Sequence, residues 1–257
     1  QMRAMTRYLI GRLDPGDVSN DPALATTVKN GTEDPDPMVR TRSIKVMGQL
    51  DLPDCFDVLQ ELVKDIDYRV RSAAIEALGK LEDPDRRITE ILARIGMDEH
   101  LSVRRMAAQT IANRMSRDQT TDSRLRSVIP FLDDEDDSVR ELAVEAIGKS
   151  NRPDSIEYLA RMKADKSPNV RAKVAQVAGS QNSRESMSIL KSLSQDDVPS
   201  VRRASVQGLR KSASSMSEPV LRNLVRDADL LVRRDSTQAL HDISWKNEEK
   251  ITSLPTS

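Results

Sequence analysis

Hydrophobic residues recur along the chain in short blocks at helical spacing. In VRSAAIEALGKL, Val70, Ala74, Ile75 and Leu78 follow the i, i+4, i+5, i+8 spacing of one helical face. The same face recurs twice further on, as Val103, Ala107, Ala108, Ile111 and as Val139, Ala143, Val144, Ile147. It weakens where Ser236 and Thr237 replace the small apolar pair. We predict a helix at each block, capped by Asp or Ser at its start and ended by a left-handed glycine.

A second, less regular helical segment precedes each block, and we call the two members of a pair helix A and helix B. Clear examples of helix A are 53–65, 84–98, 153–165 and 183–196. Pairs of this length cannot bury their apolar faces alone, so neighbouring pairs must stack. The prediction is an all-α fold, a right-handed α-solenoid of helical hairpins.

Two columns of charged residues fix the repeat. The dipeptide Val-Arg occurs in seven repeats, and an aspartate stands six residues before each arginine. Successive arginines are 31, 33, 36, 31, 31 and 31 residues apart. The aspartates are Asp34, Asp65, Asp98, Asp134, Asp165, Asp196 and Asp227, and the arginines are Arg40, Arg71, Arg104, Arg140, Arg171, Arg202 and Arg233.

The Asp and Val-Arg columns, the alanine pair and the trailing glycine together resemble the HEAT-repeat family. The likeness is greatest to its short-repeat branch found in phycobilisome-lyase-like proteins, and it covers roughly residues 2–242. The resemblance implies that the two columns form a structural ladder, in which each aspartate meets an arginine of its own or a neighbouring repeat. Such a ladder would fix the register of the layers.

The repeat pattern divides the chain into three parts. Residues 1–12 form a partial repeat that holds helix B only, and 13–242 form seven repeats in a single solenoid domain. Residues 243–257 form a polar tail, which we expect to be disordered. Because helix A of the first repeat is missing, we expect the chain to be part of a longer protein or complex.

Two stripes on helix B vary in character, as binding surfaces on rigid scaffolds do. They lie one and five residues after the column arginine, on the side that is concave in HEAT-like solenoids. Our candidate partner-binding residues there are Arg105, Gln109, Glu141, Glu145, Arg203, Gln207, Arg234 and Gln238. A solvated polar face with no partner is the alternative interpretation.

Charge is uneven along the repeats, although the chain has 40 basic and 41 acidic residues. Residues 129–165 hold ten acids and five bases, whereas 184–234 hold ten bases and six acids. An acidic middle and a basic end could orient a charged partner. The balanced total argues against a general polyanion binder.

Composition excludes several chemistries. One cysteine and two histidines leave no Cys-rich metal site, and we expect Cys55 to be a packing residue. The acidic run 133–137 lacks the glycine and closing glutamate of a calcium loop, so we interpret it as a turn. Deoxyhypusine hydroxylases of the HEAT family carry His-Glu pairs that bind iron, and this chain has none. We therefore expect no metal, no cofactor and no catalytic residue.

The leading hypothesis is a non-catalytic scaffold or adaptor that binds another protein through the concave face. A chaperone for a bilin chromophore or its phycobiliprotein acceptor, of the bilin-lyase type, is the first alternative. Nucleic-acid binding through the basic C-terminal repeats is the second, weakened by an aromatic content of only 2%. No apolar run reaches membrane-spanning length, and the cysteine usage favours an intracellular, cytoplasmic site.

Overall fold

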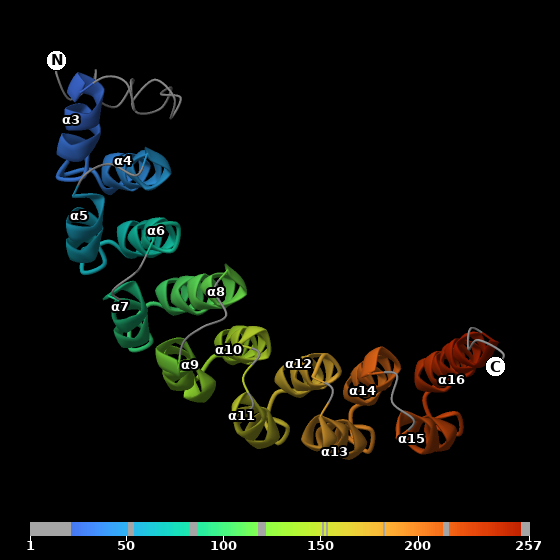
Figure 1. Cartoon of the computed structure of the whole chain (residues 1–257). Helices are drawn as coiled ribbons and strands as arrows, with labels where there is room; N and C mark the ends of the chain where they lie inside the picture. The colour runs from blue at the N-terminus through green and yellow to red at the C-terminus, as the bar shows by residue number, and fades with distance from the viewer. Residues whose placement is uncertain are drawn as a thin grey trace. The chain divides into compact units, whose positions relative to one another are not determined.

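The computed structural model describes residues 22–50, 54–82, 87–117, 122–150, 152, 154–181, 183–212 and 216–252. Every regular element in these segments is a helix (Figure 1). The predicted partial repeat, residues 1–12, lies outside the described residues. The chain divides into two compact units, Gln1–Phe131 and Leu132–Ser257, which we call unit 1 and unit 2.

Unit 1 is a series of helical hairpins with the A helices in one layer and the B helices in another (Figure 1). Its A helices are α3 (Pro22–Gly31), α5 (Cys55–Leu62), α7 (Arg87–Ile95) and α9 (Asp122–Val128). Its B helices are α4 (Pro37–Leu50), α6 (Tyr68–Leu78) and α8 (Leu101–Arg117).

Unit 2 repeats the arrangement. Helix α10 (Asp137–Lys149) is its first B helix, and three complete hairpins follow. They are α11 (Ser155–Met162) with α12 (Pro168–Ala178), α13 (Arg184–Leu193) with α14 (Pro199–Ser212), and α15 (Ser217–Leu224) with α16 (Leu230–Thr252).

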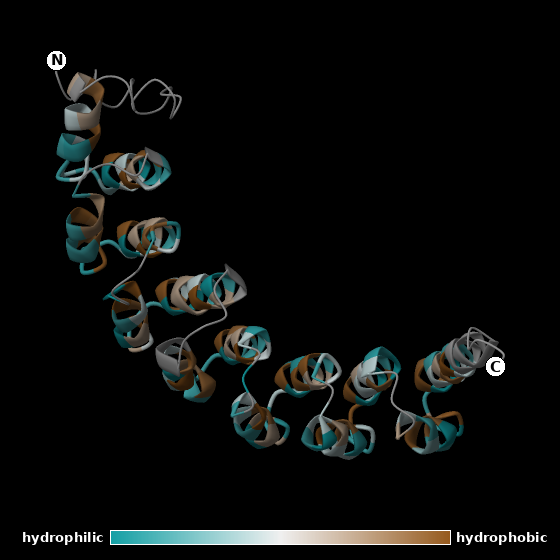
Figure 2. Cartoon of the chain, in the orientation of Figure 1, coloured by the Kyte–Doolittle hydropathy of each residue, from teal (hydrophilic) through white to brown (hydrophobic). Residues whose placement is uncertain are grey.

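The hydrophobic faces predicted for the B helices are buried. Val70, Ala74, Ile75 and Leu78 have no solvent exposure, and the corresponding residues of α8 and α10 are buried as well. Hydrophobic residues gather where the two helices of a hairpin face each other (Figure 2). Ser236, which replaces a small apolar residue, is fully buried as well. Its hydroxyl is satisfied there because it donates to the carbonyl of Val232, 2.7 Å away. The observed burial of these faces therefore confirms the stacked-hairpin prediction.

The boundary between the two units falls where the repeat is irregular, and the single domain over 13–242 stays a prediction. The helix-A segment there ends in a 3-10 helix, η1 (Ile129–Asp133). Pro130 lacks the backbone N–H that a continuing α-helix needs, which accounts for the change of helix type. The same repeat has the 36-residue step between column arginines. This step is the sequence signal for the boundary.

Two expectations about helix ends differ from the structure. Helix α16 continues to Thr252, into the segment expected to be a disordered tail, because the chain offers no Pro or Gly to stop it before Pro255. The glycines after the B-helix blocks are not left-handed: Gly79 and Gly179 have φ of −61° and −64°. No glycine in the described segments has a positive φ.

The column glycines instead allow neighbouring B helices to approach closely. A Cβ on Gly48 would lie 2.7 Å from the Cβ of Ala77 on the next B helix. A Cβ on Gly179 would lie 2.3 Å from the Cα of Gly208 on α14. Such distances are shorter than any van der Waals contact between carbon atoms. Glycine is therefore required by the stacking of layers rather than by a turn.

Candidate functional site: the ladder and the B-helix face of unit 2

Each column arginine joins two successive intra-repeat turns. The guanidinium of Arg140 donates from Nη1 to the carbonyl oxygen of Asp134 in its own turn, at 2.8 Å. Its Nε and Nη2 donate to the two carboxylate oxygens of Asp165 in the following turn, at 2.8 and 2.9 Å. This is the bidentate geometry that makes arginine–carboxylate pairs both strong and directional.

The same bidentate bond recurs at 2.7–2.9 Å in both units. The pairs are Arg40–Asp65, Arg71–Asp98, Arg140–Asp165, Arg171–Asp196 and Arg202–Asp227. Arg104 and Arg233 also bond the carbonyls of their own turns, at 3.0 and 2.8 Å. The partner of each of the five arginines thus belongs to the following repeat, which decides between the two pairings that the sequence left open.

The column aspartates also hold their own turns. Each of the seven accepts the amide N–H of the residue two positions later, at 2.7–2.9 Å. Burial raises the pKa of Asp165, but hydrogen bonds from Arg140 and the Ser167 amide more than offset it, so this pKa lies below its ordinary value. The pKa of Asp196 is lowered in the same manner, and that of Asp227 is lowered chiefly by the hydrogen bond from Arg202. The ladder therefore stabilises the charged carboxylates.

The ladder predicts an acid-sensitive fold. A carboxyl group with a lowered folded-state pKa stabilises the protein above its unfolded-state pKa, and this stabilisation is lost as the pH falls through the folded-state value. The unfolded-state pKa of Asp165, Asp196 and Asp227 is near 3.8. We expect the urea midpoint to be steady from pH 7 to 5 and to fall steeply below about pH 4. A midpoint unchanged down to pH 2.5 would contradict this expectation.

Six of the eight candidate partner-binding residues lie on what we call the B face of unit 2, the outer side chains of α10, α12, α14 and α16. Glu141 and Glu145 on α10 both contact Lys173 on α12, with Nζ–oxygen distances of 3.6 and 3.5 Å. Glu145 also pairs with Lys149, at 2.7 Å, and that hydrogen bond is the main reason why the pKa of Glu145 is lowered. The two glutamates therefore bridge neighbouring repeats.

Charged residues bridge α14 and α16 as well. Arg203 donates from Nε to the carboxylate of Asp235 at 2.5 Å, and Arg210 approaches Asp242 at 2.5 Å. Arg234, whose side chain is 64% exposed, contacts the same Asp235 at 3.0 Å. The structure thus brings Arg203 and Arg234 together at one carboxylate.

The glutamines of the second stripe differ from these charged residues. Gln176 and Gln207 are exposed and make no hydrogen bond through their carboxamides to the described residues. Gln238 is exposed and donates to Asp242 at 2.8 Å, so its oxygen stays open. Arg105 and Gln109 lie on α8 in unit 1, where Gln109 donates to Asn113 at 3.2 Å.

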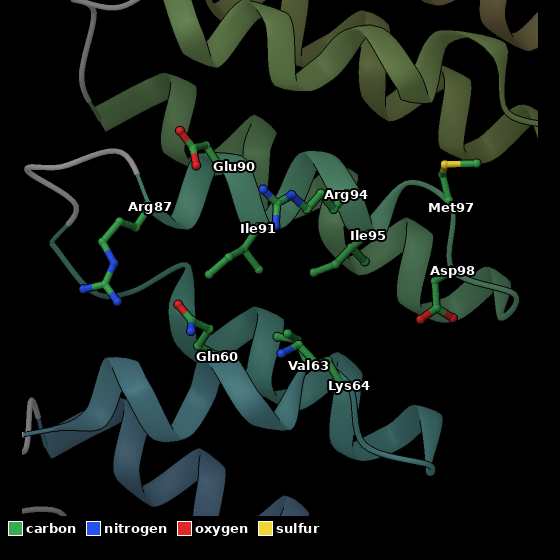
Figure 3. Close-up of a pocket in the computed structure, with 10 residues that line it drawn as sticks. All are labelled: Gln60, Val63, Lys64, Arg87, Glu90, Ile91, Arg94, Ile95, Met97 and Asp98. Carbon is green, nitrogen blue, oxygen red and sulfur yellow. The ribbon is translucent and has the colours of Figure 1, made fainter.

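A pocket that sequence reasoning missed lies in unit 1 between α5 and α7. It has a volume of about 470 Å³. Ile91 and Ile95 of α7 face Val63, the residue that follows α5, across it, and Met97 lies at one end (Figure 3). The charged lining residues are Lys64, Arg87, Glu90, Arg94 and Asp98. The irregular A helices gave no sequence signal for this pocket.

The acidic run at 133–137 lies in the intra-repeat turn and its carboxylates bond the turn's own amides. Asp134 accepts the amide N–H of Asp136 at 2.9 Å, and Asp136 accepts that of Ser138 at 2.9 Å. The described residues hold no group of three or more His, Cys, Asp or Glu side chains placed to bind a metal ion. Among the same residues, no helix has the length and hydrophobicity required to cross a membrane.

Stacked helical hairpins joined by an arginine–aspartate ladder define an α-solenoid repeat protein. The chain belongs to the HEAT-repeat family, whose model matches residues 25–112, 86–163 and 125–210. No curated protein matches the chain in sequence.

Several solved structures share the fold. An engineered protein is 15% identical, with 95% of this chain and 75% of that chain covered and a TM-score of 0.56. The CpcE–CpcF complex of phycocyanin lyase from Nostoc sp. PCC7120 is 15% identical, with 90% and 95% covered and a TM-score of 0.51. Kap95p, solved with RanGDP, is 13% identical over 86% of this chain and 35% of its own, with a TM-score of 0.58. At these identities the likeness shows the fold alone.

Proposed function

We propose that the chain is a non-catalytic scaffold that binds another protein through the B face of unit 2. The observation that carries the proposal is the contrast on this face between engaged and open side chains. Its charged residues hold the helices together through Lys173, Asp235 and Asp242, whereas the carboxamides of Gln176 and Gln207 are exposed and unbonded. Open polar side chains on a rigid framework of bridged helices suit protein recognition.

Composition weighs against nucleic acid as the ligand. Basic and acidic residues are balanced at 40 and 41, and aromatic residues, on which bases stack, make up only 2% of the chain. The likeness to the phycocyanin lyase subunits, at 15% identity, concerns the fold and assigns no lyase activity to this chain.

The test is capture of partners by the whole immobilised chain, compared with Gln176→Glu/Gln207→Glu. This variant keeps the side-chain size and adds two negative charges to the B face. We expect a defined set of captured proteins to fall at least fivefold in quantitative mass spectrometry, with no effect of prior nuclease treatment.

The matched control is Gln195→Glu/Asn223→Glu, which changes two exposed amide side chains of the A-helix side of unit 2. It should capture the same proteins as the unmodified chain. Equal capture by all three forms, or loss of the captured set on nuclease treatment, would refute the proposed function.

A further inference from the structure

Three glutamines occupy the same register on successive B helices of unit 2. Gln176, Gln207 and Gln238 each lie five residues after a column arginine, on α12, α14 and α16. The ladder bonds Arg171–Asp196 and Arg202–Asp227 fix the register of these repeats. The carboxamides therefore form one row that runs across the helices, which we call the glutamine row.

We propose that the glutamine row binds the backbone of an extended, acidic segment of the partner protein. The inference rests on the function proposed above and adds the conformation and the chemistry of the ligand. A carboxamide offers one acceptor and two donor hydrogens, which match the N–H and C=O of a peptide unit. In Gln176 and Gln207 both the carboxamide oxygen and the carboxamide nitrogen are without a hydrogen bond to the described residues. Gln238 has its oxygen open, since its nitrogen already donates to Asp242.

An extended segment fits the row better than a helix does. The backbone N–H and C=O groups of a helix are bonded internally, so a helical partner would leave the carboxamides without ligands. Packed helices are about 8–10 Å apart, and an extended chain advances about 3.3 Å per residue. One step of the glutamine row thus corresponds to about three residues of an extended segment.

Close packing of α12 and α14 brings neighbouring members of the row together. Gly179 and Gly208 bring these two helices into close contact, since a Cβ on Gly179 would meet the Cα of Gly208 at 2.3 Å. Gln207 directly precedes Gly208, and Ala172 lies one turn before Gln176 on the same side of α12. The longer side chains beside the row are held by contacts between the helices, Lys173 by Glu145 and Lys211 by the hydroxyl of Ser180.

The charges beside the row favour acidic side chains on the segment. The single carboxylate of Asp235 is shared by two guanidinium groups, with nitrogen–oxygen distances of 2.5 Å to Arg203 and 3.0 Å to Arg234. Burial raises the pKa of Asp235, but hydrogen bonds from the two arginines more than offset it, so it stays charged. Arg203, Arg210, Lys211 and Arg234 on this part of the face stand against two carboxylates, those of Asp235 and Asp242. The excess of positive charge complements a carboxylate of the ligand.

The experiment selects binders from a random library of 12-residue peptides displayed on phage, with the whole chain as the target. We expect selected peptides to be rich in Asp and Glu. A synthetic copy of one of them should lose about tenfold in affinity when either of two amides, about three residues apart, is N-methylated. It should lose a similar factor with Gln176→Met or Gln207→Met, which keep the side-chain length but remove the hydrogen bonds.

Gln195→Met, at an exposed glutamine of the turn after α13, is the control and should leave the affinity unchanged. The inference is overturned if no peptide is selected, if selected peptides bind as helices, or if neither N-methylation nor the two methionine variants reduce affinity. Loss of partner capture with Gln176→Glu/Gln207→Glu but not with the methionine variants would overturn this inference alone. Capture that is insensitive to both kinds of variant would overturn the proposed function as well.

Discussion

Gly208→Val should lower the free energy of unfolding by about 3 kcal/mol, the upper range for overpacking a close-packed site. A Cβ at this position would lie 2.7 Å from the carbonyl oxygen of Ala175 and 2.6 Å from Cδ2 of Leu190. The leucine methyl can rotate away, but the carbonyl belongs to the backbone of α12 and can move only with the helix. The measurement is urea unfolding followed by circular dichroism.

The neighbouring residue provides the control. Gln207→Val introduces the same side chain at an exposed position of the same helix and should cost about 0.5 kcal/mol through helix propensity alone. Gly208→Ala is a stricter test, because alanine is the better helix former by about 1 kcal/mol. If Gly208→Ala stabilises the protein, the close contact between α12 and α14 does not require glycine at this position.

Arg140→Ala should destabilise the protein by about 3–5 kcal/mol, as breaking a buried ion pair does. The Arg140 and Asp165 side chains are only 4% and 7% exposed, so the remaining carboxylate would be buried without its cation. The carbonyl of Asp134 would lose its bond to the guanidinium as well. Thermal unfolding of the variant and the unmodified chain, scanned at pH 7, measures this loss.

Arg161→Ala removes an arginine of the same unit whose partner, Asp133, is 74% exposed. Surface pairs of this kind contribute at most about 1 kcal/mol, so the melting temperature should hardly change. Peptide binding by Arg140→Ala, measured at a temperature where the variant is folded, should be retained because Arg140 is buried away from the B face. Equal melting temperatures for Arg140→Ala and Arg161→Ala would show that the ladder contributes no more than a surface pair.

The fold was predictable because its determinants are periodic. The spacing of Val70, Ala74, Ile75 and Leu78 identifies a buried helical face, and the Asp and Arg columns repeat with it. The direction of pairing was not predictable, since a fixed offset in sequence allows an arginine to meet its own turn or the next. The role of the column glycines was misjudged for a similar reason. A glycine near a helix end is expected both where the backbone turns and where two helices pack closely, so the sequence alone does not distinguish the two roles.

The candidate site was predictable in position but not in detail. The stripes on helix B identified Glu145, Arg203 and Gln207 as outward-facing residues. Which of them bind one another depends on distances between repeats, such as the 2.5 Å from Arg203 to Asp235. Those distances separate the bridging charges from the open carboxamides. The pocket between α5 and α7 left no sequence signal, because it results from the spacing of two irregular helices.

The direction of the ladder has a consequence for how such a chain can change in length. In the five pairs described above, an arginine reaches the aspartate of the repeat after it, and within one hairpin Arg171 reaches forward while Asp165 accepts from the repeat before. Copying or deleting one whole repeat therefore leaves every joint complete, without any compensating substitution. The column residues therefore allow the number of repeats to change without loss of the ladder. The outward-facing residues of an added copy can then diverge and bind a new ligand.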